Sequence, residues 1–252
     1  MGNREWLMKS GNKTIEADEI LSFRGVSVAV PPPYEFGLED VNLVLKTGEL
    51  ALISVERGHG LSPLADTAQG LIDPDRGKVC FLGKNWSDLS PAAEADTRQR
   101  IGRVFRGGGW ISNLNIDENI TLGQRHHTHL PVDEIYREAE KLGVFFGLKS
   151  LPVSRPAHVR RSLLRRSGWV RAFLGDPKLI LLEEPLKDAH TDVLHYLMEG
   201  IAGALSRGAA ILWITSDLRI LDQPGLAPFK TYRMKGPKLV PLKINDVENR
   251  NR

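Results

Sequence analysis

The sequence predicts an α/β fold with a largely parallel sheet and a second, helical lobe. Three observations lead to this prediction. Short apolar segments of strand length alternate with helical periodicity along most of the 252 residues. A glycine-containing turn at residues 53–64 follows one such strand and precedes a helix. Residues 110–171 have helical periodicity and little strand signal, which indicates a helical insertion between two strands of the sheet.

Composition excludes several classes of protein. A hydrophobic content of 41% and a charged content of 26% are typical of a soluble globular protein. Apolar runs such as 209–214 are far shorter than the roughly 20 residues that span a bilayer. Residues 1–13 are polar, so we expect no signal peptide. Cys80 is the single cysteine, which suits a reducing compartment, and we expect it in the core. A net charge of +3 is too small to indicate a nucleic-acid partner.

The first half of the chain is expected to form five strands and two helices. The strands are predicted at residues 19–30, 38–45, 49–54, 78–82 and 101–105. The helices are predicted at residues 64–71 and 89–100, the second with a proline at its start. Three prolines end the first strand, and three glycines at 107–109 follow the fifth.

The second half returns from helices to strands. Within the helical block, the clearest helices are predicted at residues 132–142 and 159–173. Further strands are predicted at residues 179–182, 210–215, 231–234 and 238–241. Helices are predicted at residues 188–207 and 216–221. We therefore expect a polar N-terminal extension (1–18), one domain (19–244, with a helical subdomain at about 110–171) and a polar tail (245–252).

The turn at residues 53–64 is similar to a phosphate-binding loop but departs from its pattern. Such a loop reads Gly-x-x-x-x-Gly-Lys-Ser/Thr, and its backbone N–H groups and lysine hold phosphates. In this frame valine replaces the first glycine at Val55, and Leu61 replaces the lysine. A β-branched residue resists the backbone conformation that glycine permits, and leucine supplies no charge.

Part of the pattern remains. The retained residues are Gly58, Gly60 and Ser62. Pro63 follows them and has no N–H to donate at the start of the helix. Arg57 or His59 could supply positive charge, though from a different position than the lysine.

The order and spacing of several segments resemble the ATP-binding subunit of ABC transporters along roughly residues 19–234. The matching segments are 38–43 with 48–50, 70–79, 101–105 with 119–120, 176–185 and 208–218. Taken in that order, they are similar to the family's segment before the P-loop, the segment after it, the Q-loop region, Walker B and the switch region. The resemblance implies the ABC ATPase fold, which has a P-loop NTPase-type parallel core sheet, an antiparallel β edge and a helical subdomain.

The resemblance also assigns roles at Walker B and the P-loop. Glu183 stands at the position that orders Mg²⁺, where the family has Asp, and Ser62 stands at a second Mg²⁺ ligand. Glu184 keeps the position of the general base, and Arg106 replaces the Q-loop glutamine. The implied cofactors are ATP and Mg²⁺, and with so many replacements we expect weak binding of both. A base without positioned phosphates has no reaction to assist.

Two further positions depart from the family. The signature Leu-Ser-Gly-Gly-Gln aligns with residues 159–163, which include Arg160, Arg161 and Ser162. Ser216 replaces the switch histidine. The arginines here are either a solvated face or a contact for an anion or an acidic partner. Tyr34 lies near, but offset from, the position of the aromatic that stacks on adenine.

Three smaller features of the sequence bear on metal sites, docking and family. The histidines of residues 126–129 are expected in a polar loop rather than in a metal site. Residues 107–110 are either a docking surface for a membrane subunit or a flexible loop. Residues 122–147 are similar to subunits that serve bacterial lipid transporters of the MCE (Mla-like) type.

The resemblance implies partners, because ABC ATPase subunits act as head-to-tail dimers beside membrane-embedded permease chains. We therefore expect permease subunits and a second ATP-binding subunit, equal or different, on the cytoplasmic face of the membrane. The leading hypothesis is a degenerate ATP-binding subunit with a structural or regulatory role and impaired or absent hydrolysis. The alternatives are an active but unorthodox transport ATPase and a soluble pseudo-ATPase that binds another protein.

Overall fold

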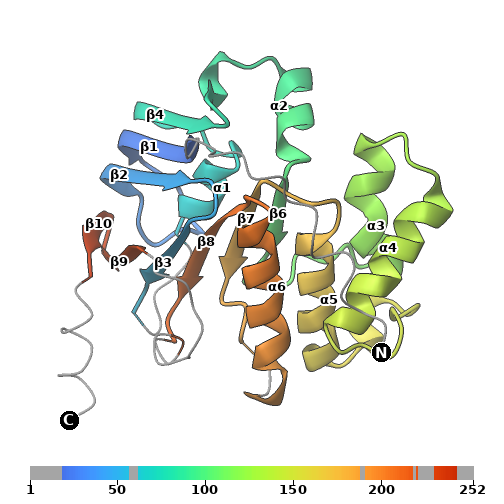
Figure 1. Ribbon diagram of the computed structural model, residues 1–252. Helices are drawn as coiled ribbons and strands as arrows, with labels where there is room; N and C mark the ends of the chain where they lie inside the picture. The colour runs from blue at the N-terminus through green and yellow to red at the C-terminus, as the bar shows by residue number, and fades with distance from the viewer. Residues whose placement is uncertain (1–18, 57–61, 188–190, 218–219, 221–229, 243–252) are drawn as a thin grey trace, which may run out of the picture.

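A computed structural model describes residues 19–56, 62–187, 191–217, 220 and 230–242 (Figure 1). The predicted N-terminal extension and polar tail lie outside these residues, as do residues 218, 219 and 221 of the helix predicted at 216–221. The described strands form two sheets, one with four strands and one with six. Every helix in the described part of the chain is too short or too polar to cross a bilayer.

The six-stranded sheet has the order β10-β9-β3-β8-β7-β6. Its strands are β3 (Leu50–Ser54), β6 (Ile101–Val104), β7 (Leu179–Glu183), β8 (Ala210–Thr215), β9 (Lys230–Lys235) and β10 (Lys238–Pro241). All neighbours are parallel except β10, which pairs antiparallel with β9. The predicted parallel core is thus confirmed, and the carboxyl ends of β3, β6, β7 and β8 meet at one edge.

The four-stranded sheet is antiparallel and has the order β2-β1-β4-β5. Its strands are β1 (Glu19–Val28), β2 (Leu38–Lys46), β4 (Arg76–Phe81) and β5 (Lys84–Asn85). The antiparallel edge that the resemblance implies is therefore a sheet of its own. Cys80 was expected in the core, but its side chain in β4 is only partly buried.

Six α-helices are described: α1 (Leu64–Ala68), α2 (Pro91–Arg98), α3 (Ile116–His127), α4 (Val132–Phe145), α5 (Arg161–Phe173) and α6 (Leu194–Ser206). Figure 1 shows α3 and α4 as a lobe to one side of the sheet, with α5 and α6 between them and the strands. The long helix predicted at residues 188–207 was wrong at its start, since α6 begins at Leu194 after a 3-10 turn (Thr191–Val193). The polar loop expected at residues 126–129 was wrong for His126 and His127, which lie in the last turn of α3, whereas Thr128 and His129 follow the helix.

Alternate residues of the central strands face two different cores, because side chains of a strand point to opposite faces in turn. Ile53 of β3 and Leu181 of β7 pack toward α1 and the antiparallel sheet. Leu52 and Leu182, one residue away on the same strands, pack toward α3 to α6. The sheet is therefore covered on both faces, which explains why these strands are apolar throughout.

Helix α5 approaches β6 very closely, and Gly102 makes this approach feasible. A Cβ atom at Gly102 would lie 1.7 Å from the carbonyl oxygen of Ala172 in α5. This contact fixes α5, and with it the arginines at the start of the helix, against the strand that leads to Arg106.

Candidate functional site

Most of the residues proposed from the sequence gather at the carboxyl edge of the parallel sheet. Glu183 ends β7 and Glu184 follows it, Arg106 lies just after β6, and Ser216 follows β8. Ser62 lies two residues before α1. Ligand sites of open parallel sheets form at this edge. Gly58, Gly60 and Leu61 lie outside the described residues, so their arrangement remains a prediction.

Glu184 is joined to the end of β8 by both oxygens of its carboxylate. Its Oε1 accepts a hydrogen bond from the backbone N–H of Ser216 at 2.8 Å. Its Oε2 accepts one from the hydroxyl of Thr215 at 3.1 Å. Glu184 also has a φ of +46°, a left-handed conformation that costs energy for a residue other than glycine. The structure thus brings the two proposed catalytic residues together, through the backbone of Ser216.

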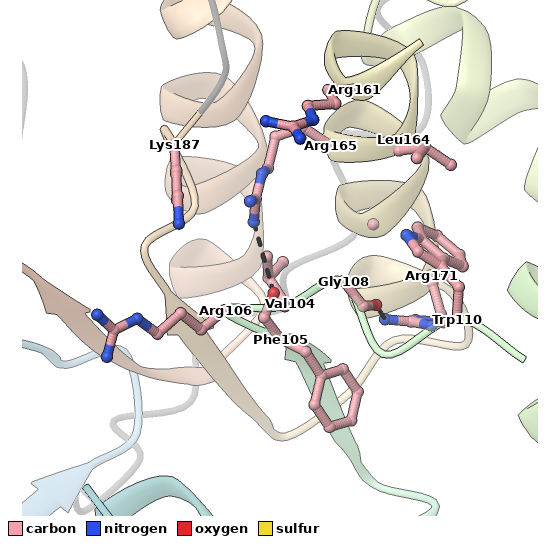
Figure 2. Close-up of a pocket in the computed structure, with 12 residues that line it drawn as sticks. Val104, Phe105, Arg106, Gly108, Trp110, Arg161, Leu164, Arg165, Arg171 and Lys187 are labelled. Carbon is pink, nitrogen blue, oxygen red and sulfur yellow. Dashed lines mark hydrogen bonds between the residues drawn. The ribbon is translucent and has the colours of Figure 1, made fainter. Parts of the chain in front are cut away.

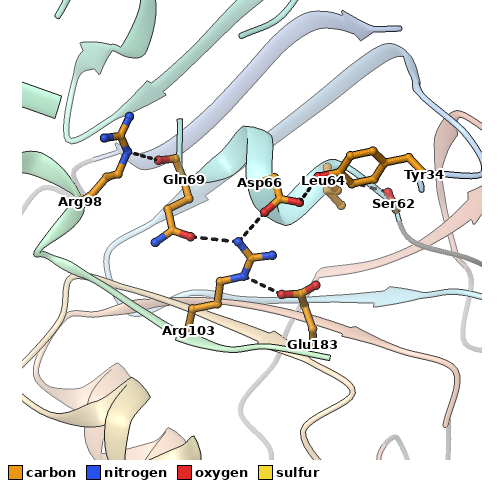
Figure 3. A network of polar contacts seen from close by, with 8 residues as sticks. All are labelled: Tyr34, Ser62, Leu64, Asp66, Gln69, Arg98, Arg103 and Glu183. Atoms are coloured by element: carbon orange, nitrogen blue, oxygen red, sulfur yellow. Dashed lines mark hydrogen bonds and ion pairs between the residues drawn. The ribbon is translucent and has the colours of Figure 1, made fainter. Parts of the chain in front are cut away.

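A residue that the sequence analysis did not select occupies the centre of the site. Arg103 of β6 is buried, with 6% of its side chain exposed. Its Nε donates to Glu183 Oε1 at 2.6 Å, and its Nη1 donates to Asp66 Oδ1 at 2.7 Å and to Gln69 Oε1 at 3.0 Å (Figure 3). One guanidinium therefore ties the end of β7 to helix α1. The available signal was a charged residue inside the apolar run 101–105.

The polar cluster extends from Arg103 to Tyr34, whose hydroxyl donates to Asp66 Oδ2 at 2.7 Å. Burial, together with the charge of Asp66, raises the pKa of Tyr34 to about 12, so this hydroxyl keeps its proton at neutral pH. Tyr34, expected near an adenine-stacking position, is thus held against α1. In all, four segments of the chain meet around Arg103.

Burial raises the pKa of Glu183 above its ordinary value, and the charge of Arg103 opposes this shift. Burial acts to lower the pKa of Arg103, but Glu183 and Asp66 outweigh it, so the pKa of Arg103 is raised. Two carboxylates share one guanidinium, and each group depends on the others because a buried charge without a partner is costly.

The residues present do not fit the magnesium ion that this class of site implies. The carboxylate of Glu183 already accepts a hydrogen bond from a buried cation at 2.6 Å. A divalent ion at the same carboxylate would lie within a few ångströms of the guanidinium. The two positive charges would repel strongly there, because little water is present to screen them. The hydroxyl oxygen of Ser62, the other proposed Mg²⁺ ligand, accepts a hydrogen bond from the backbone N–H of Leu64 at 3.4 Å.

Val55 continues β3 instead of forming a glycine-type turn. Its N–H donates to the carbonyl of Thr215 at 2.9 Å, and its side chain joins the core between the two sheets. The expectation of backbone strain at Val55 was wrong, because it keeps the extended pairing of a strand. The described non-glycine residues with positive φ are Asp40, Leu82, Asp176 and Glu184.

The proposed signature arginines lie where α5 begins. Arg160 is the residue before the helix, and Arg161 and Ser162 are its first two residues. Arg161 and Arg165, one turn apart on α5, both line a pocket that also contains Arg106 (Figure 2). In the described part of the chain, no group of three or more His, Cys, Asp or Glu side chains is placed to hold a metal ion.

These features define the ATP-binding cassette class: a parallel sheet with a loop and helix at its carboxyl edge, an antiparallel sheet, and a helical lobe. Comparison with known proteins agrees with this assignment. The family model for ABC transporters matches residues 38–187, and the chain belongs to that family.

Similar proteins include the intermembrane phospholipid transport system ATP-binding protein MlaF of Haemophilus influenzae, which is 28% identical over 147 residues. That match covers 58% of this chain and 56% of the relative. The probable ribonucleotide transport ATP-binding protein mkl of Mycobacterium tuberculosis is 28% identical over 211 residues, which cover 81% of this chain and 58% of the relative. The chain thus matches less than two thirds of the length of either relative.

A solved dimeric structure of the ATP-binding cassette MJ0796, bound to ADP and Pi, has a similar fold. The TM-score is 0.77 at 20% identity, covering 89% of this chain and 99% of that one. A nucleotide-free ATP-binding cassette matches with a TM-score of 0.69 at 20% identity, covering 92% of this chain and 94% of that one. These likenesses establish the ABC ATPase fold.

Proposed function

We propose that this chain is a degenerate ATP-binding subunit of an ABC-type transporter, structural or regulatory, in which ATP hydrolysis is impaired or absent. The observation that carries the proposal is the pairing of Glu183 with the buried guanidinium of Arg103. Phosphoryl transfer depends almost entirely on positioned phosphates and on cations that offset their charge. In this chain an internal cation engages the carboxylate that would hold the metal.

The P-loop substitution supports the same proposal. Leu61 replaces the lysine that would contact the phosphates, so a fixed positive charge is missing from the sequence. Glu184 keeps the position of the general base, but both of its oxygens accept hydrogen bonds from the end of β8. A general base acts only when the nucleophile and phosphate are positioned beside it.

The partners proposed for this subunit are permease chains and a second ATP-binding subunit, equal or different, on the cytoplasmic face of a membrane. A similar cassette of known structure is described as dimeric, and relatives are named as transport ATP-binding proteins. Two relatives carry different cargo names, phospholipid and ribonucleotide. Lipid transport of the Mla-like type is our proposal for the system that this subunit serves.

An active but unorthodox transport ATPase is the second candidate. The observation in its favour is that Glu184 and Ser216, the general-base and switch positions, lie in hydrogen-bonding contact at the carboxyl edge of the sheet. In this case, the arginines near the site would have to supply the charge that the lysine normally provides.

Calorimetric titration with ATP, in the presence of Mg²⁺ and in the presence of EDTA, tests the proposal. We expect weak binding, with an affinity that Mg²⁺ does not increase, because Arg103 already neutralises Glu183. Micromolar affinity that requires Mg²⁺ and is lost in Ser62→Ala would support the active ATPase. Ser206→Ala, an exposed serine at the end of α6, is the matched control.

A further inference from the structure

Residues 29–37 join β1 to β2 and contact helix α1, and we refer to them as the β1–β2 loop. The base of this loop is closed tightly. A Cβ atom at Gly37 would lie 2.0 Å from the carbonyl oxygen of Val28. The N–H of Ala29 donates to Asp75 Oδ2 at 2.6 Å, which ties the start of the loop to the turn before β4. Because both ends are fixed, movement of the loop is confined to its tip.

Tyr34, near the tip of the loop, fastens that tip to α1. Its hydroxyl donates to Asp66 Oδ2 at 2.7 Å (Figure 3). The side chain of Tyr34 is half-buried, and burial raises its pKa to about 12, so the hydroxyl keeps the proton that it donates. A hydrogen bond to a carboxylate is stronger than one between neutral groups. The ring of Tyr34 is therefore held against the helix that follows the P-loop-like turn.

Asp66 connects this contact to the carboxyl edge of the six-stranded sheet. Its other oxygen, Oδ1, accepts from Arg103 Nη1 at 2.7 Å, and Arg103 Nε donates to Glu183 at 2.6 Å. A continuous chain of hydrogen bonds thus runs from the β1–β2 loop through α1 and β6 to the end of β7. Linked hydrogen bonds strengthen one another where little water is present. Each contact in the chain therefore favours the closed position of the loop.

We propose that the β1–β2 loop is a strap that holds the nucleotide site shut, with the hydroxyl of Tyr34 as its latch. The inference rests on the proposed function, in which a weak nucleotide site lies at this edge of the sheet. When a ligand binds only to the open form, its apparent affinity is reduced by the fraction of molecules that are open. The latch therefore lowers the affinity for nucleotide, whereas an aromatic ring that stacks on a base would raise it.

Tyr34→Phe tests the latch, because it removes the hydroxyl and keeps the ring. We expect the fluorescent nucleotide mant-ATP, in EDTA, to bind about tenfold more tightly to Tyr34→Phe than to the unmodified full chain, and to associate faster. Tyr136→Phe removes the same atom from α4 in the helical lobe. It is the matched control and should bind mant-ATP as the unmodified chain does.

Hydrogen exchange in the absence of nucleotide measures the opening of the latch itself. The amides of residues 34–37 should exchange about tenfold faster in Tyr34→Phe, because the tip of the loop opens more often when its hydrogen bond to Asp66 is lost. In Tyr136→Phe these amides should exchange at the rate of the unmodified chain.

Unchanged exchange in Tyr34→Phe overturns the inference, and so does faster exchange without tighter binding of mant-ATP. If Tyr34→Ala binds mant-ATP more weakly while Tyr34→Phe binds it as the unmodified chain does, the ring stacks on the base and the strap is likewise ruled out. The proposed function fails by a different result. Magnesium-dependent hydrolysis that is lost in Glu184→Gln would refute it and would leave the strap in place.

Discussion

The proposed loss of hydrolysis rests on Arg103, a buried residue that pairs with two carboxylates. Its partners Asp66 and Glu183 are separated from it by 37 and 80 residues along the chain, so no local pattern predicts the pairing. The sequence reveals only that an arginine interrupts an apolar strand. By contrast, the contact between Glu184 and Ser216 follows from motif positions at the ends of neighbouring parallel strands, and sequence reasoning selected both residues.

Substitution of Arg103 with Met should destabilise the fold by about 3–5 kcal/mol at neutral pH, because it leaves Glu183 and Asp66 without their counter-charge. Burial raises the folded-state pKa of Glu183, and loss of Arg103 removes an opposing influence. In the variant, the free energy of unfolding therefore falls as the pH rises through the folded-state pKa of Glu183, because the ionised carboxylate is buried without a partner. The loss of stability should therefore shrink as pH falls toward 4.5, the ordinary pKa of this group.

Urea unfolding of Arg103→Met at pH 7.5 and 5 measures this difference. Arg207→Met, which breaks an exposed ion pair with Asp176, is the control and should cost at most about 1 kcal/mol. A loss for Arg103→Met as small as that of the control, or one that grows on acidification, would rule out the ion-pair account.

The elements that position the site differ in how far the sequence predicts them. Strands β7 and β8 were predicted nearly to the residue, because buried parallel strands are short apolar runs between turn signals. Helix α3 was not singled out, since its polar last turn, with Arg125, His126 and His127, reads like a loop. Basic residues there are favourable because they face the negative end of the helix dipole.

The contact between α5 and β6 predicts the effect of adding one methyl group. Gly102→Ala would place a Cβ atom against the backbone oxygen of Ala172. We therefore expect the free energy of unfolding to fall by about 1–3 kcal/mol. Gly123→Ala on α3 has open space around the new Cβ and should gain up to about 1 kcal/mol. Thermal unfolding of both variants checks this prediction, and similar midpoints for the two would contradict it.

At the scale of the whole molecule, two cores on either side of the six-stranded sheet hold the antiparallel sheet and the helical lobe in place. The order of motifs predicted this architecture, because strand, loop, helix and insertion follow each other in a fixed sequence in ABC cassettes. The electrostatics of the site could not be predicted in the same way. They depend on which charged side chains from α1, β6 and β7 meet, which only the packed structure reveals.

We propose that magnesium-dependent ATP hydrolysis by this cassette is impaired or absent, and steady-state release of phosphate from Mg-ATP tests this proposal most directly. The purified chain and Glu184→Gln should release phosphate at the same background rate, with or without Mg²⁺. Hydrolysis that requires Mg²⁺ and is abolished in Glu184→Gln would contradict the claim.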